Sequence, residues 1–447
     1  MIIQNWWFTT LLEHKYKVCP PLQKDIECDV LIVGGGMSGI SAAAAFINKG
    51  LNVVVIEKNI IGGGTTGKSA GFMTPDSELE LSQIVRRYGI KGAKEIWEIP
   101  TYGIKLVDDY IKKYDIKCDY RNQDSLFLGT GKNGINVVKE EEHGRKEVGF
   151  TNQKVYNESE LKTIVNCNDF AGGIRYDDTF GFNPLQYLQG MKTVLIDNGI
   201  QIFESTEVNK IVDHTAYTDA GSIKAKDIIV AIDKMTDDFN KLSNEIYHAQ
   251  TFLSVSEPLS DKLVSELLPS GEDFQMWDDT LVYSYWRLIN ENRLLLGGGN
   301  AITTFTPFMW NHNNVIGGVH DRFKKHFPVL KDLNFIQYWP GLIDTTRDLL
   351  PIVIRDEKNP NIRIIQGAVG LPWASFCGDF VAKNILDTEG DADSKYFEYL
   401  SNRRNFSFPI WMQKIISKPV MFALSNGWAK YFQKDSGNIL QEKENEF

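Results

Sequence analysis

Three glycines and one carboxylate form the part of this sequence whose spacing points most plainly to chemistry. Gly34, Gly36 and Gly39 follow directly after the apolar run 29–33. In such a turn the first glycine permits a tight bend, the second lets the backbone approach a pyrophosphate, and the third lets helix and strand pack closely. Glu57 comes about twenty residues after the turn, where a carboxylate can accept hydrogen bonds from a ribose. The pattern predicts a dinucleotide site.

The elements that must position these residues are predicted to be a strand, a helix and a second strand. Residues 29–33 and 52–57 are short apolar runs rich in β-branched side chains, which is typical of strands buried on both faces of a parallel sheet. Residues 40–46 between them read as helix, whose amino end would point N–H groups at phosphates. A carboxylate at Glu57 would repel a 2′-phosphate, which disfavours NADP.

The loop that follows favours FAD over NAD. An NAD domain normally continues into another helix and strand, whereas residues 61–71 are dense in glycine, threonine and serine. Such a loop can wrap a ligand closely with backbone and hydroxyl groups, although a flexible surface loop is the alternative. In this part of the chain, the residues expected to contact FAD are Gly34, Gly36, Met37, Ser38, Gly39, Glu57, Lys58, Gly64, Thr65, Thr66, Lys68, Ser69, Ala70 and Gly71.

Several segments together resemble one known family. Residues 29–71, 182–187, 339–348 and 364–370 are similar to the D-amino-acid oxidase-like FAD-dependent oxidoreductases, the group with glycine oxidase, sarcosine oxidase and γ-glutamylputrescine oxidase. The resemblance covers most of the chain, from about residue 6 to residue 390. An early Trp pair and the carboxyl-terminal tail look most like the γ-glutamylputrescine oxidase branch.

The resemblance implies an α/β fold (α+β overall), with a Rossmann-like FAD-binding domain and an inserted substrate domain on a mixed, mostly antiparallel β-sheet. Residue patterns independently predict strands at 125–128, 249–255, 281–288 and 293–296, and a helix over 93–114 that is interrupted near Pro100. The expected bounds are 26–85, 150–240 and 335–392 for the discontinuous FAD-binding domain, 86–149 and 241–334 for the substrate domain, 1–25 for an N-terminal arm and 393–447 for a C-terminal helical tail.

The resemblance also implies cofactor contacts far along the chain. A helix amino end after residue 367 would stabilise the negative charge of a reduced flavin, and Pro372 suits a first helical turn, although an ordinary strand-to-helix turn is the alternative. Gly341 stands where sarcosine oxidases carry the cysteine that tethers the flavin, so FAD is expected to be non-covalent. These further contacts are Val208, Ala231, Gly341, Gly367, Val369, Gly370, Leu371 and Pro372.

The activity that the resemblance implies is oxidation of the C–N bond of an amine or amino acid. Flavin N5 accepts a hydride from the carbon next to the nitrogen, which leaves an imine that water hydrolyses. Oxygen or another acceptor reoxidises the flavin, and Leu295, where sarcosine oxidases have a lysine that promotes the oxygen reaction, suggests that oxygen is a poor acceptor. The alternatives are a flavin dehydrogenase of a non-amine substrate, such as a polyol phosphate, and a non-catalytic flavin-holding subunit.

Candidate substrate contacts come from two places. Alternation along 283–287 puts Tyr285 and Arg287 on one face of a strand, where Arg287 would pair with a substrate carboxylate. An edge arginine paired with Asp278 or Asp279 is the equal alternative. In the family's closing segment a T-P-D motif is usual, and this chain places an arginine at its centre. The residues expected to be catalytic are therefore Tyr285, Arg287 and Arg347.

The composition of the chain argues against several classes of binding partner. The net charge of -10 and the pI near 5.4 argue against nucleic acid, because no basic surplus exists to neutralise phosphates. The five cysteines are widely spaced, and no histidine pattern suggests a metal site, so we expect a cytoplasmic protein without metal. No apolar run is long enough to span a membrane, and the aromatic stretch 406–432 reads as a docked or an interfacial helix. The oligomeric state is left open.

Overall fold

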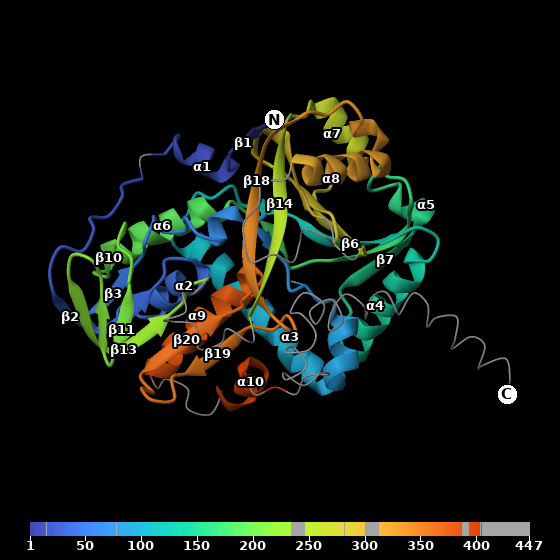
Figure 1. The fold of residues 1–447 in the computed structure, drawn as a ribbon. Coiled ribbons are helices and arrows are strands. Elements are labelled where there is room, and N and C mark those ends of the chain that lie inside the picture. Colours follow the sequence, from blue (N-terminus) through green and yellow to red (C-terminus); the bar gives the residue numbers. More distant parts are fainter. Residues whose placement is uncertain are drawn as a thin grey trace.

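The computed structural model describes residues 1–14, 16–76, 78–233, 246–280, 282–299, 313–386, 393–402 and 404. Within these residues two large sheets stand side by side, with helices packed on and between them (Figure 1). A small sheet of β4 (Phe72–Met73), β9 (Phe180–Gly181) and β5 (Arg121–Asn122) forms a third unit. The mixed α/β architecture agrees with the predicted fold class.

The first large sheet contains the predicted nucleotide-binding unit. Strand β2 (Ile26–Val33) pairs in parallel with β3 (Val53–Ile56) and with β13 (Ser222–Val230), and all four residues of β3 are buried. Both strands predicted around the glycine turn are therefore confirmed. The other strands of this sheet are β10 (Gln201–Phe203), β11 (Lys210–Val212), β12 (Thr215–Tyr217), β19 (Ile352–Arg355) and β20 (Ile362–Gln366).

The second sheet has the order β1-β18-β14-β17-β16-β15-β6-β8-β7. Its neighbours pair antiparallel except β1 with β18 and β15 with β6, so the predicted mixed, mostly antiparallel sheet is confirmed. The strands are β1 (Ile2–Ile3), β6 (Asp124–Thr130), β7 (Gln153–Asn157), β8 (Phe170–Tyr176), β14 (Ile246–Pro258), β15 (Phe274–Asp278), β16 (Tyr285–Ile289), β17 (Arg293–Gly298) and β18 (Phe335–Thr346).

The predicted domain bounds do not coincide with the division between the sheets. β7, β8 and β18 belong to the nine-stranded sheet, although 150–240 and 335–392 were assigned to the FAD-binding domain. The long strands β14 and β18 pair with each other and run through the middle of the molecule (Figure 1). The strand predicted at 281–288 begins only at Tyr285, and Val208 lies outside any strand.

The helix predicted over 93–114 is longer and breaks elsewhere. Helix α3 (Leu81–Lys113) passes through Pro100 without interruption, and Gly89 is the position with non-helical backbone, at φ 71°. A proline removes one N–H but is tolerated where packing holds the helix, and Pro100 is buried. The other helices are α1 (Trp6–Leu11), α2 (Met37–Ala45), α4 (Gly134–Val148), α5 (Glu158–Leu161), α6 (Pro184–Asp197), α7 (Asp261–Leu267), α8 (Asn313–His326), α9 (Leu371–Leu386) and α10 (Asp393–Leu400).

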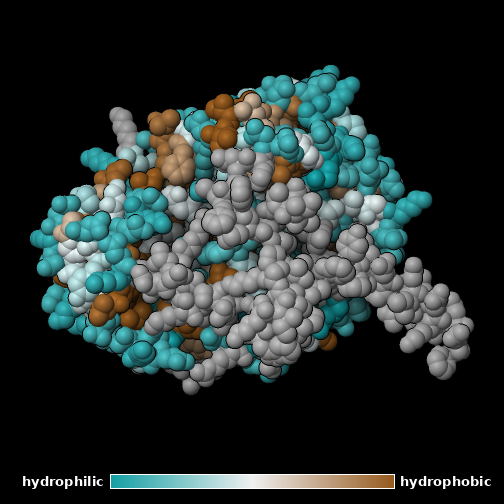
Figure 2. Space-filling view, viewed as in Figure 1, coloured by the Kyte–Doolittle hydropathy of each residue, from teal (hydrophilic) through white to brown (hydrophobic). Residues whose placement is uncertain are grey.

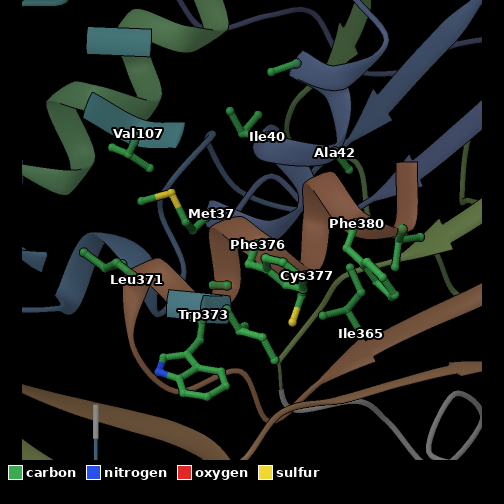
Figure 3. Packing of buried hydrophobic residues seen from close by; sticks show 14 of the residues in the cluster. Met37, Ile40, Ala42, Val107, Ile365, Leu371, Trp373, Phe376, Cys377 and Phe380 are labelled. Atoms are coloured by element: carbon green, nitrogen blue, oxygen red, sulfur yellow. The ribbon is translucent and has the colours of Figure 1, made fainter. Parts of the chain in front are cut away.

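Helices α2, α3 and α9 pack into one core beside the first sheet, and Figure 3 shows side chains of α9 lying between Met37 of α2, Val107 of α3 and Ile365 of β20. Two glycines make this approach possible. A Cβ at Gly378 of α9 would lie 2.0 Å from the carbonyl oxygen of Ser38, and a Cβ at Gly103 of α3 would lie 1.9 Å from that of Pro372. The beginning of α2 therefore packs closely against the middle of α9, and the beginning of α9 packs closely against α3.

On the face in Figure 2 the coloured atoms are mostly hydrophilic, with smaller hydrophobic areas. Among the residues that the structure describes, no helix is long and apolar enough to cross a membrane. All five cysteines are buried and unpaired. Of the predicted C-terminal helical tail, α10 is observed, and the stretch 406–432 lies outside the described residues.

Candidate functional site

A cavity lies where the carboxyl ends of β2 and β13 face the nine-stranded sheet. Its walls come from the start of α2, the loop after β3, the start of α9, and strands β14, β16 and β18. Tyr285 and most of the residues predicted to contact FAD line it, namely Gly36, Met37, Ser38, Thr65, Thr66, Lys68, Ser69, Ala70, Gly71, Ala231, Gly341, Val369, Gly370, Leu371 and Pro372. Predicted residues outside this lining are Gly34, Gly39, Glu57, Lys58, Gly64, Val208, Gly367, Arg287 and Arg347.

The glycine turn has the close contacts that its sequence predicts. Gly34 has φ 110°, and a Cβ there would lie 2.3 Å from the carbonyl oxygen of Ala231. A Cβ at Gly39 would lie 1.9 Å from the carbonyl oxygen of Gly34. Gly36 is the N-cap of α2, and Gly36, Met37 and Ser38 line the cavity, so the helix amino end faces it. This arrangement is suited to a pyrophosphate.

Two side chains hold the turn from behind. Glu57 accepts hydrogen bonds from the backbone N–H groups of Gly35 and Asn59, each at 2.8 Å. Burial raises the pKa of Glu57, and these two bonds oppose the rise. Thr66 accepts a hydrogen bond from the N–H of Met37 at 3.1 Å, which joins the loop to the first turn of α2. Contact of Glu57 with a ribose stays a prediction.

The glycine-rich loop 61–71 is tied down by side chains from distant segments, so the flexible-loop alternative does not fit. The carbonyl oxygens of three consecutive loop residues accept hydrogen bonds from three buried side chains. One of these side chains lies in the N-terminal arm, one in β16 and one in β18. The bonds run from Trp339 Nε1 to Lys68 O at 3.1 Å, from Trp7 Nε1 to Ser69 O at 2.8 Å and from Arg287 Nε to Ala70 O at 2.9 Å. The loop therefore presents a preformed edge to the cavity.

The start of α9 provides a second helix amino end at the cavity. Gly367 and Gly370 have φ values of 65° and 93°, which allow the sharp turn from β20 into the helix. Leu371 and Pro372 begin the helix and line the cavity. Oε1 of Gln366, which is 2% exposed and lines the same cavity, accepts no hydrogen bond in the part of the chain that the structure describes. The cavity thus offers an unmatched acceptor to a ligand beside the start of α9.

The other end of the cavity has an aromatic and carboxylate wall. The rings of Tyr283 and Tyr285 lie 5.5 Å apart, and Phe72 stands edge-on to Tyr285 at 5.9 Å. The hydroxyl of Tyr283 donates to Oε1 of Glu78 at 3.0 Å. Asp76 also lines this end. Burial raises the pKa of Tyr285 to about 12, so the phenol stays protonated at neutral pH and is no base.

A buried cluster stands behind this wall. Nη2 of Arg145 donates to Oδ1 of Asp76 at 3.2 Å, and its Nε lies 2.8 Å from Oε1 of Glu141. The guanidinium is 3.7 Å from the ring centroid of Tyr176. Burial raises the pKa of Asp76 well above its usual range, although Arg145 opposes the rise. One arginine serves two carboxylates, so the cluster contains more acidic than basic groups.

The prediction that Arg287 pairs with a substrate carboxylate does not fit the structure. Arg287 is 0% exposed, lies outside the cavity lining, and donates to the carbonyl oxygens of Ala70 at 2.9 Å and Phe182 at 2.6 Å. Its remaining bonds go to Gln123 and to the Leu288 carbonyl, not to the predicted Asp278 or Asp279. Strand alternation placed it on the correct face, but the loop 61–71 covers that end of the strand.

Other predicted residues have mixed placements. Arg347 is buried at 3% exposure at the end of β18, outside the cavity lining, so its catalytic role stays a prediction. Nδ1 of His248 forms a hydrogen bond with Oδ1 of Asp344 at 2.7 Å. Lys68 lines the cavity, and burial lowers its pKa. Val208 is buried in the apolar core of the first sheet.

Sequence reasoning missed much of the substrate end. The missed lining residues include Phe72, Thr74, Asp76, Glu78, Thr251, Leu253 and Trp277. One local signal was present, because acidic residues follow within a few positions of the glycine-rich loop at 76–80. The contribution of β15 through Trp277 depends on long-range strand pairing, which no local pattern reveals.

These observations fit a bound flavin dinucleotide. Close backbone contacts at Gly34 and Gly39 fix the turn, two helix amino ends face the cavity, and the tethered loop lines it between them. When bound, FAD would supply a two-electron acceptor. Gly36, Ser38 and the loop 65–71 are placed to hold it, and the start of α9 is placed to stabilise negative charge.

Comparisons with known proteins agree with this reading. The family model described as FAD dependent oxidoreductase (DAO) matches residues 29–383. The γ-glutamylputrescine oxidoreductase of Escherichia coli is 26% identical over 404 residues, which is 89% of this chain and 91% of that protein. The probable oxidoreductase OrdL of Haemophilus influenzae is 25% identical over 378 residues, which is 82% of this chain and 85% of that protein.

Among solved structures, glycine oxidase from Geobacillus kaustophilus has the same fold. It superposes with a TM-score of 0.72 over 85% of this chain and 100% of that chain, at 17% sequence identity. At this identity the likeness concerns the fold. The nucleotide turn and the cavity between the sheets thus belong to a known architecture.

Proposed function

The chain belongs to the DAO family of FAD-dependent oxidoreductases, and we propose that it oxidises the C–N bond of an amine or amino acid. The observation that carries the proposal is the continuous cavity, which joins the cofactor residues to a wall of tyrosines and carboxylates. One similar protein is named for an amine derivative and one for an amino acid. Both substrate classes are consistent with the family.

The residues of the chain would bind and orient the two reactants. The tethered loop 65–71 and the starts of α2 and α9 hold the cofactor, while Tyr283, Tyr285 and Trp277 enclose the substrate. A hydride would pass from the carbon next to nitrogen to the bound two-electron acceptor, and the nitrogen lone pair would form the C=N bond of an iminium ion. Loss of an N–H proton to water would give the imine that water hydrolyses. Because that lone pair must be free, the substrate reacts as the neutral amine. No dedicated base is then required.

The electron acceptor and the mode of attachment are further parts of the proposal. Gly341 lines the cavity at the position compared with the tethering cysteine, and glycine offers no nucleophile, which supports non-covalent FAD. Leu295 is fully buried in an apolar cluster, which supports an acceptor other than oxygen. Slow reoxidation of the reduced protein by air, compared with a quinone, would support this, whereas fast reaction with oxygen would contradict it.

Two other functions are less well supported. A polyol phosphate dehydrogenase needs cations for the phosphate, and Lys68 is the one lysine or arginine in the cavity lining among the described residues. A non-catalytic flavin subunit would not need an enclosed aromatic wall beside the cofactor. A cytoplasmic location is supported by the five unpaired cysteines, which suit a reducing compartment.

The test is product formation by the FAD-loaded protein. Purified protein is incubated without oxygen with a panel of amines and amino acids and an artificial electron acceptor, and the aldehyde or keto acid is measured with the reduced acceptor in equal amounts. We expect turnover with at least one nitrogen compound and none with glycerol phosphate. Turnover of glycerol phosphate alone would overturn the proposal.

A further inference from the structure

A buried glutamine in the cavity wall has an oxygen atom without a partner. Gln366 is the last residue of β20, is 2% exposed and lines the cavity. Its Oε1 accepts no hydrogen bond from the residues that the structure describes. A buried carbonyl oxygen without a donor is unfavourable, and native proteins contain few such atoms. The side chain is therefore suited to accept a hydrogen bond from a bound ligand.

The amide group also limits what that ligand can be. Within the described part of the chain, Oγ of Ser69 is the other buried atom of the lining that has no partner, but a hydroxyl can both donate and accept. In the amide of Gln366 the oxygen only accepts and the NH2 group only donates. A ligand that satisfies this amide needs an N–H or O–H group, and an acceptor beside it completes the match.

The order of the strands shows which half of a dinucleotide Gln366 would meet. β3, β2, β13 and β20 are parallel neighbours in this order, so their carboxyl ends lie on one edge of the sheet. Glu57 follows β3, the glycine turn follows β2, and Gln366 ends β20. Glu57 and Gln366 are thus three strand spacings of about 4.8 Å apart, on opposite sides of the turn.

A pyrophosphate at the glycine turn lies between the two halves of FAD. Glu57 is the predicted ribose partner on the β3 side, so the flavin half extends the other way, past β13 toward β20. The cavity lining agrees with this direction, because it contains Gln366 and Ala231, which follows β13, but not Glu57. Gln366 therefore lies on the flavin side.

The pyrimidine edge of an oxidised flavin fits an amide. This edge has one N–H group, at N3, between the carbonyl groups at C2 and C4. Oε1 of Gln366 can accept a hydrogen bond from N3–H while its NH2 group donates to one neighbouring carbonyl. The first N–H groups of α9, which begins at Leu371 and faces the same cavity, have no partner within the helix and suit the other carbonyl.

We propose that Gln366 holds the pyrimidine edge of the flavin by accepting a hydrogen bond from N3–H, and so fixes the orientation of the ring beside the start of α9. The inference rests on one part of the proposed function, namely that the cavity binds FAD. Gln366 is a positioning residue for the cofactor, so the test measures binding and not turnover.

An FAD methylated at flavin N3 tests the proposal on the wild-type protein. The methyl group removes the only N–H of the pyrimidine edge and leaves Oε1 of Gln366 without a donor. Full-length apoprotein is titrated with FAD and with 3-methyl-FAD, and the two dissociation constants are compared. We expect 3-methyl-FAD to bind at least tenfold more weakly. Equal affinities would overturn the inference.

A variant shows whether Gln366 causes the discrimination. Gln366→Ala removes the unpaired oxygen and leaves room for the methyl group, so we expect the ratio of the two dissociation constants to fall below threefold. Gln201→Ala is the matched control, because Gln201 is exposed on β10 of the same sheet, and the wild-type ratio should stay. A wild-type ratio in Gln366→Ala would overturn the assignment to Gln366.

ADP, which carries only the adenosine half, tests the alternative contact. Adenine also presents a donor beside an acceptor, so an amide could hold it instead. We expect wild type and Gln366→Ala to bind ADP equally, and weaker binding of ADP by the variant would overturn the flavin contact. If the inference fails while amines or amino acids still reduce bound FAD, the proposed function stands. Protein that binds neither form of FAD overturns both.

Discussion

Gly39 shows how strictly single residues shape the cofactor turn. A methyl group at this position would lie 1.9 Å from the carbonyl oxygen of Gly34, and that oxygen belongs to backbone that cannot move away. Gly34 in turn has a left-handed backbone and lies against the carbonyl oxygen of Ala231. The turn therefore depends on two glycines for space as well as for conformation.

We predict that Gly39→Ala purifies with less than a tenth of the FAD of the wild type, because α2 must move away from β2. FAD content is measured from the absorbance released by acid. Gly317→Ala is the control, since a Cβ there meets nothing within 4 Å. Full FAD content in Gly39→Ala would contradict the assignment of this turn to the cofactor.

Arg287 is a second single residue on which the site depends, and its role is structural. Its side chain joins β16 to the carbonyl oxygens of Ala70 and Phe182, and burial lowers its pKa to about 10, so it stays charged at neutral pH. In Arg287→Met both carbonyl oxygens lose a charged donor, and we predict a loss of about 3–5 kcal/mol in the free energy of unfolding.

Denaturant unfolding checks this value, and FAD affinity is measured on the same variant. The control is Arg86→Met, whose partner Glu140 is exposed, and it should cost less than about 1 kcal/mol. If Arg287→Met has normal stability and loses only amino-acid turnover, the result would support the earlier prediction that Arg287 binds a substrate carboxylate.

At the scale of elements, the amino end of α9 is positioned by its contacts with α3 and α2. Gly103 of α3 touches the carbonyl of Pro372, in the first turn of α9. The same helix has an open glycine at Gly89, where a Cβ meets nothing within 4 Å. One helix therefore offers both a test position and a comparison.

We predict that Gly103→Ala shifts the start of α9 and weakens FAD binding at least tenfold. Gly89→Ala should cost about 1–2 kcal/mol of stability, because its φ is positive, but leave FAD affinity unchanged. Isothermal titration of the apoprotein with FAD and denaturant unfolding separate the two effects. Equal FAD affinities for both variants would contradict a role of α9 in the cofactor site.

Local elements explain which parts could be predicted from sequence. The strand, turn and helix from β2 to α2 follow from neighbouring residues, and Gly34 and Gly39 have the tight turn and the close packing that were predicted. The break at Gly89 instead of Pro100 was missed because packing holds the proline within the helix. The burial of Arg287 and the lining by Trp277 depend on strands and loops distant in sequence, so no periodicity reveals them.

At the scale of the whole molecule, the five buried cysteines give a test of the fold. Burial raises the pKa of Cys28, Cys118, Cys167 and Cys377 to about 12, and it also raises that of Cys19. We predict that the native protein reacts with a thiol reagent at none of these positions within minutes, and that five thiols react after denaturation. Rapid reaction of a native thiol would contradict the described packing.

The same shifts predict how stability depends on pH. In the folded chain the pKa values of these cysteine thiols lie above the ordinary value of 9.0. The contribution of the buried thiols to the free energy of unfolding is therefore fully present below pH 9. Above pH 9 the thiols of the unfolded chain ionise first, so stability falls as the pH rises toward 12. Denaturant midpoints between pH 7 and pH 11 measure this fall, and a midpoint that rises with pH would contradict it.

The two sheets together make the site, because neither the glycine turn nor the aromatic wall encloses a cavity alone. The residues proposed to hold FAD come from segments that are far apart, so we expect FAD binding to stabilise the folded chain. The central claim is that the FAD held in this cavity takes two electrons from an amine or amino acid.

The most direct measurement is anaerobic titration of the FAD-loaded protein with amines and amino acids while the visible flavin spectrum is recorded. The account predicts full bleaching by at least one of these compounds, one equivalent per flavin, and loss of the bleaching in Gly39→Ala. Protein that folds but binds no FAD, or bound FAD that no amine or amino acid reduces, would contradict the account.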